Sequence, residues 1–281
     1  MISYPKHVGT TMTRVIEAGR GASPIIFVHG VSAYAHRWLQ NLDAMGNAGH
    51  HSYAFDLPGH GFATKRAEFV HSVPAYAKFL RAFMDAISTR SAVLVGTSLG
   101  GHVVGAAACH APERVHALVM VGSLGVEVGA TVRRLIASAI RNTGREGIRA
   151  KLQRAHADPS LVSDDWVEED FQINNSYGAK ETFERLARYI DKDLDEDCVG
   201  APLARLSQRI PMLLVWGEKD RSVGLDVAVA AHKALPGSRL VVIAGAGHAP
   251  YFERPLAFNS AVTDFLSGTL DNRAAGEVIY R

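Results

Sequence analysis

The chain has 281 residues, of which 47% are hydrophobic and 21% are charged, and its formal net charge at pH 7 is +2. This length and composition suit one large hydrophobic core with an inserted subdomain, and the small net charge without a long basic run argues against nucleic acid as a partner. The first residues contain no apolar signal segment, and no uninterrupted apolar stretch is long enough to cross a bilayer, so we expect no membrane partner.

The residues that commonly bind metals or cofactors show no recognisable arrangement. The two cysteines, Cys109 and Cys198, lie in different predicted regions, which argues against a disulfide framework and favours a cytoplasmic location. The thirteen histidines form no His-Glu-x-x-His or other tight ligand spacing, and no dinucleotide-binding or phosphate-binding loop is present. We therefore expect no metal and no cofactor.

The first two predicted strands are each followed by a loop with glycine. An apolar strand over 24–28 leads into a His-Gly-Val sequence, and a strand over 52–55 leads into Asp-Leu-Pro-Gly-His-Gly. The first loop offers a free backbone N–H, which we assign to Val31, for an oxyanion that develops during a reaction. The second loop is typical of a tight turn, in which Asp56 and His60 hold the loops together.

The third predicted strand precedes the most informative motif of the chain. An apolar run over 91–95 is followed by Gly-Thr-Ser-Leu-Gly-Gly at 96–101, and a helix is expected over 102–110. This is a G-x-S-x-G sequence at a strand-to-helix turn, the context in which the motif indicates a nucleophile. The glycines permit a sharp turn that holds Ser98 at positive φ and lifts its hydroxyl clear of the backbone. The backbone N–H of Leu99 is the second expected oxyanion donor.

After a strand over 115–121 the pattern changes to helices alone, and no clear strand appears from 125 to 208. Helical stretches are expected there over 132–141, 146–156, 164–174 and 180–191. Elsewhere strands alternate with helices, which predicts an α/β protein with a mostly parallel sheet and helices on both faces. The helical segment is therefore predicted to be an insert in that core.

Two further strands are each followed by a candidate catalytic residue. A buried strand over 210–217 precedes Asp220, and a strand over 239–243 precedes His248. Loops at the carboxyl ends of parallel strands collect the catalytic groups of open α/β sheets. A serine nucleophile needs an adjacent base and the base needs an orienting carboxylate, so Ser98, His248 and Asp220 form a candidate triad. Two acidic neighbours compete with Asp220 for the third position.

Together these motifs resemble the α/β-hydrolase family. The matching segments are His-Gly at 29–30, Asp-Leu-Pro-Gly-His-Gly at 56–61, Gly-Thr-Ser-Leu-Gly-Gly at 96–101, Gly-Glu-Lys-Asp at 217–220 and Gly-His at 247–248. The joint match is specific for the fold and for a triad, but weakly specific for the substrate. The resemblance implies an α/β-hydrolase core over 1–124 and 209–281, and a helical cap, or lid, over 125–208 that covers the active site.

The cap is the expected source of contacts with a small-molecule substrate. Most of its charges suit solvated helix faces and most of its aromatic residues suit its own core, so the sequence does not single out one residue. The candidates for substrate contact are Trp166, Phe171, Tyr177, Phe183, Tyr189, Arg185 and Arg188. A homo-oligomer is compatible with the sequence, which does not decide the oligomeric state.

The serine nucleophile narrows the reaction. Haloalkane dehalogenases and epoxide hydrolases of similar layout use an aspartate at this position, so Ser98 argues against both. We expect a serine hydrolase that cleaves a small or medium carboxylic ester, lactone or related acyl compound through an acyl-enzyme.

Two alternatives stay open. The first is a C–C hydrolase of a meta-cleavage-type product in aromatic catabolism, in which Arg185 or Arg188 would hold a substrate carboxylate. Such enzymes typically carry Asn before the nucleophile and Trp after the catalytic histidine, where this chain has Thr97 and Ala249. The second is a small-molecule receptor on a hydrolase scaffold, which a slow single turnover with a large cap movement would distinguish from an enzyme.

Overall fold

A computed structural model of the chain describes residues 1–126, 129–270 and 278–280. Their strands form one sheet in the order β1-β2-β4-β3-β5-β6-β7-β8-β9. The strands are β1 (Ile2–Val8), β2 (Thr11–Ala18), β3 (Ser23–Val28), β4 (His50–Phe55), β5 (Ala92–Thr97), β6 (Val115–Val121), β7 (Met212–Gly217), β8 (Ser238–Ile243) and β9 (Val278–Tyr280). Every pair from β4 to β9 is parallel, whereas β1 and β2 pair antiparallel with their neighbours. The predicted α/β fold with a mostly parallel sheet is confirmed.

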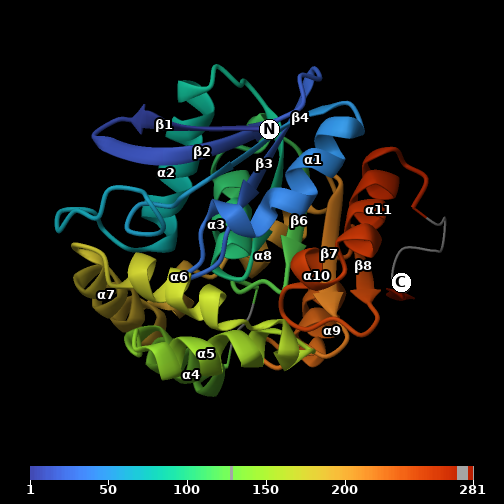
Figure 1. Cartoon of the computed structure of the whole chain (residues 1–281). Coiled ribbons are helices and arrows are strands. Elements are labelled where there is room, and N and C mark those ends of the chain that lie inside the picture. The colour runs from blue at the N-terminus through green and yellow to red at the C-terminus, as the bar shows by residue number, and fades with distance from the viewer. Residues whose placement is uncertain (127–128, 271–277, 281) are drawn as a thin grey trace.

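Helices cover both faces of the sheet (Figure 1). The α-helices are α1 (Leu39–Asn47), α2 (Val73–Ala86), α3 (Leu99–His110), α4 (Ala130–Arg141), α5 (Arg145–Ala155), α6 (Asp164–Asn174), α7 (Ala179–Lys192), α8 (Gly200–Leu206), α9 (Leu225–Ala234), α10 (Pro250–Glu253) and α11 (Pro255–Leu266). The 3-10 helices are η1 (Ala35–Trp38), η2 (Pro112–Arg114), η3 (Pro159–Leu161) and η4 (Leu194–Asp197).

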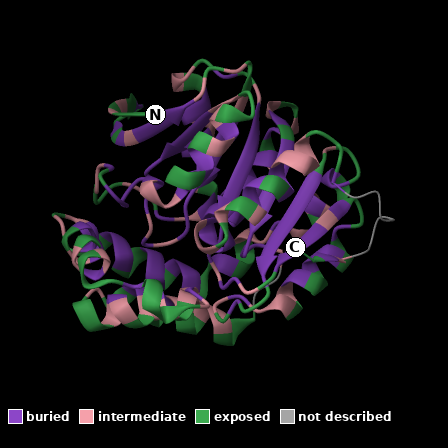
Figure 2. Cartoon of the chain, turned by 45° about the vertical axis from the view of Figure 1, so that its right-hand side comes forward, coloured by how far each residue is buried: buried purple, intermediate pink, exposed green. Residues whose placement is uncertain are grey.

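The core divides into two layers because side chains alternate along each strand. In β3, Ile26 and Val28 pack in a cluster with residues of α2, α3 and α9, whereas Ile25 and Phe27 pack in a cluster with residues of α1 and α11. Strands buried on both faces need apolar residues at nearly every position, which explains the continuous apolar runs in the sequence. Figure 2 shows the buried strands between the helical layers.

Two strands that the sequence pattern did not indicate form one edge of the sheet. β1 and β2 form a hairpin, and β2 pairs with β4. The outer strand β1 is mostly exposed, so it lacks the apolar run that marks a buried strand. Its pairing with β2 comes from hydrogen bonds along an edge, which leave little trace in the hydrophobic pattern.

Between β6 and β7 the chain forms α4 to α8, and α4 to α7 lie beyond the carboxyl ends of the parallel strands (Figure 1). The short helix α8 packs instead in the core layer with α3, where Leu203 lies close to Gly105. In the described part of the chain, no helix is both long and apolar enough to span a membrane.

Candidate active site

Ser98 occupies a sharp turn between β5 and α3 at the centre of the sheet. Its φ is 53° and its ψ is −119°, a strained conformation for a residue with a side chain. A Cβ atom on Gly96 would lie 2.2 Å from the Gly100 carbonyl oxygen, and one on Gly100 would lie 2.4 Å from the Val28 carbonyl oxygen. Both glycines are therefore required by the close approach of backbone segments at this turn.

The helix after the turn begins earlier than the sequence predicted. It starts at Leu99 and includes the glycines, whereas the pattern indicated a start at 102. Glycine has a low helix propensity, so the pattern placed these residues in the turn. The tertiary packing of the turn against β3 and β6, where the Ser98 N–H donates to the Val121 carbonyl at 2.8 Å, overrides that preference.

His248 and Asp220 meet at the carboxyl ends of β8 and β7. The His248 Nδ1 donates to the Asp220 Oδ2 at 2.7 Å, and the Asp220 side chain has no exposed surface. The other carboxylate oxygen accepts hydrogen bonds from the backbone N–H groups of Ser222 and Val223. The carboxylate is therefore fixed from both sides, and the imidazole keeps its Nε2 for other contacts.

Asp220, and neither of its acidic neighbours, is the carboxyl group that contacts His248. Glu218 accepts a hydrogen bond from the Gly245 N–H at 2.9 Å. Asp226 lies in the first turn of α9, where an acidic side chain interacts favourably with the helix dipole.

The environment of His248 favours its protonated form. Burial lowers the pKa of its imidazole, but the charge and hydrogen bond of Asp220, together with the charge of Glu253, raise the pKa by more. The net pKa is therefore raised above the ordinary value for histidine. Such an imidazole can accept a proton and hold it beside the carboxylate.

The loop that carries His248 is held by the insert, which sequence reasoning missed. The His248 backbone N–H donates to the Ala155 carbonyl at 2.7 Å, at the end of α5. The Glu253 carboxylate accepts from the N–H groups of Gly247 and Ala157 at 2.8 and 2.7 Å. The sequence signal for this contact is weak, because Glu253 lies in a segment that is common to many α/β hydrolases.

Ser98 and His248 line one cavity of about 160 Å³ that is partly open to solvent. Val31 lines the same cavity, and Gly30 before it is so close to Ser98 that a Cβ atom added to it would lie 3.2 Å from the Ser98 Cβ. Leu99, the second predicted oxyanion donor, is the first residue of α3, where a backbone N–H has no partner within the helix.

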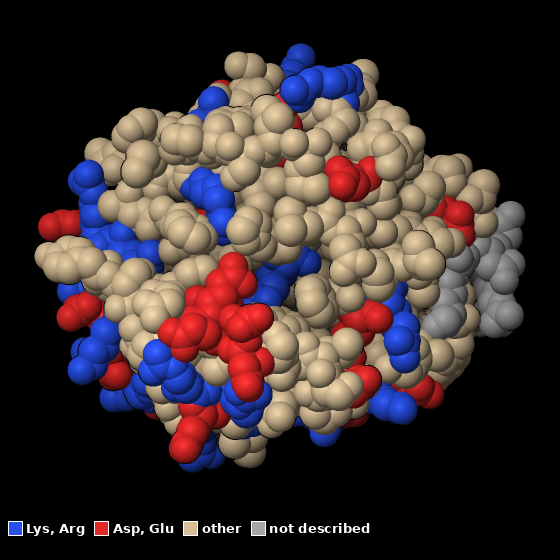
Figure 3. Space-filling model, in the orientation of Figure 1, with Lys and Arg blue, Asp and Glu red and all other residues tan. Residues whose placement is uncertain are grey.

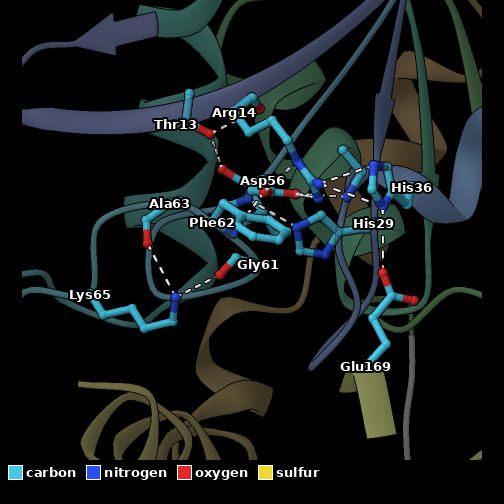
Figure 4. Close-up of polar contacts among 12 residues, drawn as sticks. Thr13, Arg14, His29, His36, Asp56, Gly61, Phe62, Ala63, Lys65 and Glu169 are labelled. Atoms are coloured by element: carbon cyan, nitrogen blue, oxygen red, sulfur yellow. Dashed lines mark hydrogen bonds and ion pairs between the residues drawn. The ribbon is translucent and has the colours of Figure 1, made fainter. Parts of the chain in front are cut away.

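Two side chains organise the loops behind this cavity. His29 Nε2 accepts from the Leu57 N–H at 2.9 Å and its Nδ1 donates to the Gly30 carbonyl at 2.8 Å, while burial lowers its pKa to about 4. Asp56 pairs with Arg14 at 3.1 Å and accepts from the Ala35 N–H at 2.7 Å (Figure 4). The Asp56 carboxylate is thus used to hold the loops, as the sequence suggested, and His29 acts beside it.

Of the five predicted aromatic contacts, Trp166 lines the cavity, where its ring lies 5.0 Å from the rings of His156 and Phe252. The other four have different surroundings. Phe171 lies under the Arg145 guanidinium, and the Tyr177 side chain is 99% exposed.

Phe183 and Tyr189 are both buried by contacts with the core. Phe183 packs edge-on against His60. The Tyr189 hydroxyl accepts from the Val73 N–H and donates to Asp197.

The two predicted cap arginines face away from the cavity. Arg185 lines a separate hollow together with Lys65 and His71, and its guanidinium donates to the Ala67 carbonyl. Arg188 is exposed on the outside of α7. The expectation that one of them holds a substrate carboxylate is therefore not supported by their placement, because both project from a helix face that does not border Ser98.

Sequence reasoning also missed an ion pair in the cavity wall. The Arg37 guanidinium pairs with the Asp170 carboxylate, which also accepts from the Tyr34 hydroxyl at 3.0 Å. Because Arg37 follows β3 and Asp170 belongs to α6, no local pattern links them. In the described residues, no group of three or more His, Cys, Asp or Glu side chains is arranged to hold a metal ion.

A family model described as alpha/beta hydrolase fold matches residues 23–255. The match covers well over half of the chain, so this protein belongs to the α/β-hydrolase family, a family of hydrolases.

Curated relatives include proteins with different activities. The dihydrolipoyllysine-residue acetyltransferase component of the acetoin cleaving system of Cupriavidus necator is 30% identical over 260 residues, which are 91% of this chain and 66% of that protein. This chain thus spans less than two thirds of that relative's length. The 2-hydroxy-6-oxononadienedioate/2-hydroxy-6-oxononatrienedioate hydrolase of Paraburkholderia phymatum is 26% identical over 260 residues, 89% of each chain.

Solved structures share the fold at lower identity. The 2-hydroxy-6-oxo-6-phenylhexa-2,4-dienoate hydrolase of a Rhodococcus species has a TM-score of 0.85 at 21% identity, with 95% of this chain and 98% of that chain covered. A meta-cleavage product hydrolase of Pseudomonas fluorescens has a TM-score of 0.82 at 23% identity, with 94% and 97% covered. At these identities the likeness concerns the fold.

Proposed function

We propose that this protein is a serine hydrolase that cleaves a small or medium carboxylic ester, lactone or related acyl compound. The observation that carries the proposal is the 2.7 Å contact between His248 and a fully buried Asp220, in a cavity that Ser98 also lines. A histidine oriented by a carboxylate beside a serine in a strained strand-to-helix turn is the arrangement that activates a hydroxyl for attack.

In the proposed reaction Ser98 attacks the carbonyl carbon while His248 takes the hydroxyl proton. Asp220 holds the imidazole with its Nδ1 protonated and stabilises the imidazolium that forms. The backbone N–H groups of Val31 and Leu99 stabilise the oxyanion, a donor of this kind being worth about 3 to 4 kcal/mol. His248 then protonates the leaving group, and a water molecule hydrolyses the acyl-enzyme in a second cycle of the same steps.

The insert over 125–208 is proposed to act as a cap that excludes water and selects the substrate. Its contact with the His248 loop through Ala155, and the presence of Trp166 in the cavity wall, support this role.

The first test is turnover of p-nitrophenyl esters and lactones by the wild type and by Ser98→Ala. We expect the substitution to leave the fold intact, as circular dichroism would show, and to lower kcat by about four to six orders of magnitude. Normal turnover by a pure Ser98→Ala preparation would refute the role of Ser98.

The second candidate is hydrolysis of a C–C bond, and the relatives named as hydrolases of oxononadienedioate-type compounds favour it. The residues beside the proposed triad, Thr97 and Ala249, and the placement of Arg185 and Arg188 favour ester or lactone cleavage. Incubation with a ring-cleavage product and an ester of similar size distinguishes the two, because a C–C hydrolase should prefer the diketone by a large factor in kcat/KM.

A further inference from the structure

The cavity wall contains an ammonium group that the proposed reaction does not use. Lys151 reaches from α5 to the loop after β3, where its Nζ donates to the Ser32 Oγ at 2.7 Å. Both residues line the cavity, and the lysine is half-buried. Among the residues that the structure describes, the Ser32 hydroxyl is the one hydrogen-bond acceptor that Lys151 has.

Within residues 1–126, 129–270 and 278–280, no carboxylate forms an ion pair with this ammonium group. Asp170 is the acidic side chain that acts on it, but Asp170 is already paired with Arg37. Burial lowers the pKa of Lys151 to about 8, while Asp170 opposes the change and Arg37 reinforces it. The amine is therefore still largely protonated at neutral pH, and its charge is only partly compensated.

An ammonium group in a cavity wall without its own carboxylate reduces stability, because burial disfavours the charged form. Groups of this kind are concentrated at functional sites. Figure 3 shows Lys and Arg atoms at the bottom of a hollow near the centre of the view, beside a cluster of acidic side chains.

The position of Lys151 indicates which part of a substrate it would meet. Ser32 belongs to the loop that carries Val31, and this loop contacts Ser98 through Gly30. In the proposed reaction the leaving group lies toward His248, which protonates it. Our proposal places the acyl portion of the substrate along this loop, so that its far end meets Lys151.

We propose that Lys151 determines specificity by binding a carboxylate on the acyl portion of the substrate, so that the preferred substrates are monoesters of dicarboxylic acids or lactones that carry a free carboxylate. This inference rests on the proposed serine hydrolase function. In the bound state the carboxylate pairs with the ammonium group that Ser32 positions, and the charge in the wall is neutralised. The pairing persists in the acyl-enzyme, because the acyl portion stays attached to Ser98 until water releases it.

The test compares two esters that share length and leaving group, mono-p-nitrophenyl adipate and p-nitrophenyl hexanoate, with the rate of Ser98→Ala subtracted as background. We expect the wild type to prefer the adipate, and Lys151→Met to lower the ratio of the two kcat/KM values about tenfold or more. The matched control is Arg149→Met, which removes an equal charge from α5, the helix of Lys151, where Arg149 forms an exposed pair with Asp164 of α6. It should leave the ratio unchanged.

A structural role for Lys151 predicts other results. If the lysine only holds the loop, Lys151→Met should lower both kcat/KM values equally and lower the Tm. The proposed role predicts a Tm that is unchanged or raised, because a partly compensated charge is removed. An equal loss on both esters, or a wild type without a preference for the adipate, overturns the inference.

Failure of the proposed function gives a separate result. If neither ester is hydrolysed, the esterase proposal fails, and binding then tests Lys151 directly. Adipate should raise the Tm of Ser98→Ala, and adipamide should not. The same adipate shift in a Ser98→Ala, Lys151→Met double variant, or no adipate shift in Ser98→Ala, would contradict the role of Lys151.

Discussion

At the scale of single residues, the properties of the site come from the backbone conformation of Ser98 and from the charges around His248. Ser98 is exposed to the cavity by a backbone conformation that its glycine neighbours permit. The His248 imidazole has a raised pKa because Asp220 and Glu253 together outweigh the effect of burial. The chemistry of the site therefore comes from common residues in unusual positions.

The raised pKa of His248 leads to a prediction about pH. The reaction needs the neutral imidazole as base, so protonation of His248 inactivates the free enzyme. We expect kcat/KM to fall as pH decreases, with a midpoint above the ordinary histidine value of about 6.5. The measurement is kcat/KM against pH on an ester for which chemistry limits the rate.

His156, the other histidine of the cavity wall, does not interfere with this measurement. Burial lowers its pKa to about 4, so it stays neutral across the range in which His248 titrates. A rate that is constant down to pH values well below 6 would contradict the assignment of His248 as base.

At the scale of elements, the strands and the helices of the insert contribute different parts of the site. The parallel strands bring the segments after β3, β5, β7 and β8 to one edge of the sheet, where Ser98, Asp220 and His248 lie. The helices of the insert supply the opposite wall of the cavity, including Trp166 and Lys151. The proposed reacting groups thus belong to the core, and the residues proposed to contact the rest of a substrate belong mainly to the insert.

This division predicts that Trp166 selects substrates by size. Trp166→Ala should change the preference between two esters that differ in acyl bulk by about 1 to 3 kcal/mol, because a large side chain leaves the cavity wall. The measurement is the ratio of kcat/KM values for the pair. Tyr177→Ala is the control, since that side chain is 99% exposed and should leave the ratio unchanged. Equal ratios for the wild type and Trp166→Ala would refute selection by this residue.

At the scale of the whole molecule, the insert is tied to the core by buried polar contacts. The Arg37 and Asp170 side chains are 11% and 1% exposed and join the loop after β3 to α6. The Asn174 amide also donates to the Ser32 carbonyl at 3.5 Å. These contacts position the insert over the cavity.

The ion pair gives a prediction about stability. Asp170→Asn leaves the Arg37 charge buried without its carboxylate, so the free energy of unfolding should fall by about 3 to 5 kcal/mol. Urea denaturation measures this change. Glu168→Gln removes an exposed pair with Arg145, which solvent screens, and should lower the free energy of unfolding far less. Similar losses for the two variants would show that the buried pair does not hold the insert.

The sequence by itself determined the family, most of the parallel strands, and Ser98, Asp220 and His248 as the candidate catalytic residues. These follow from local signals, because an apolar strand and the loop after it are contiguous, and parallel strands bring such loops together. The edge strand β1 was missed because it is mostly exposed and has no apolar run, and its neighbour β2 was missed with it.

Only the tertiary structure decided which residues form the rest of the cavity. Lys151 and Ser32 are 119 residues apart in the chain, and Arg37 and Asp170 are 133 apart. The sequence pattern does not distinguish the roles of the five cap aromatics. In the structure, Trp166 lines the cavity, Phe183 is buried against His60 and Tyr177 is exposed. Which face of a cap helix meets the core depends on how the whole insert packs, and no short stretch of sequence contains that information.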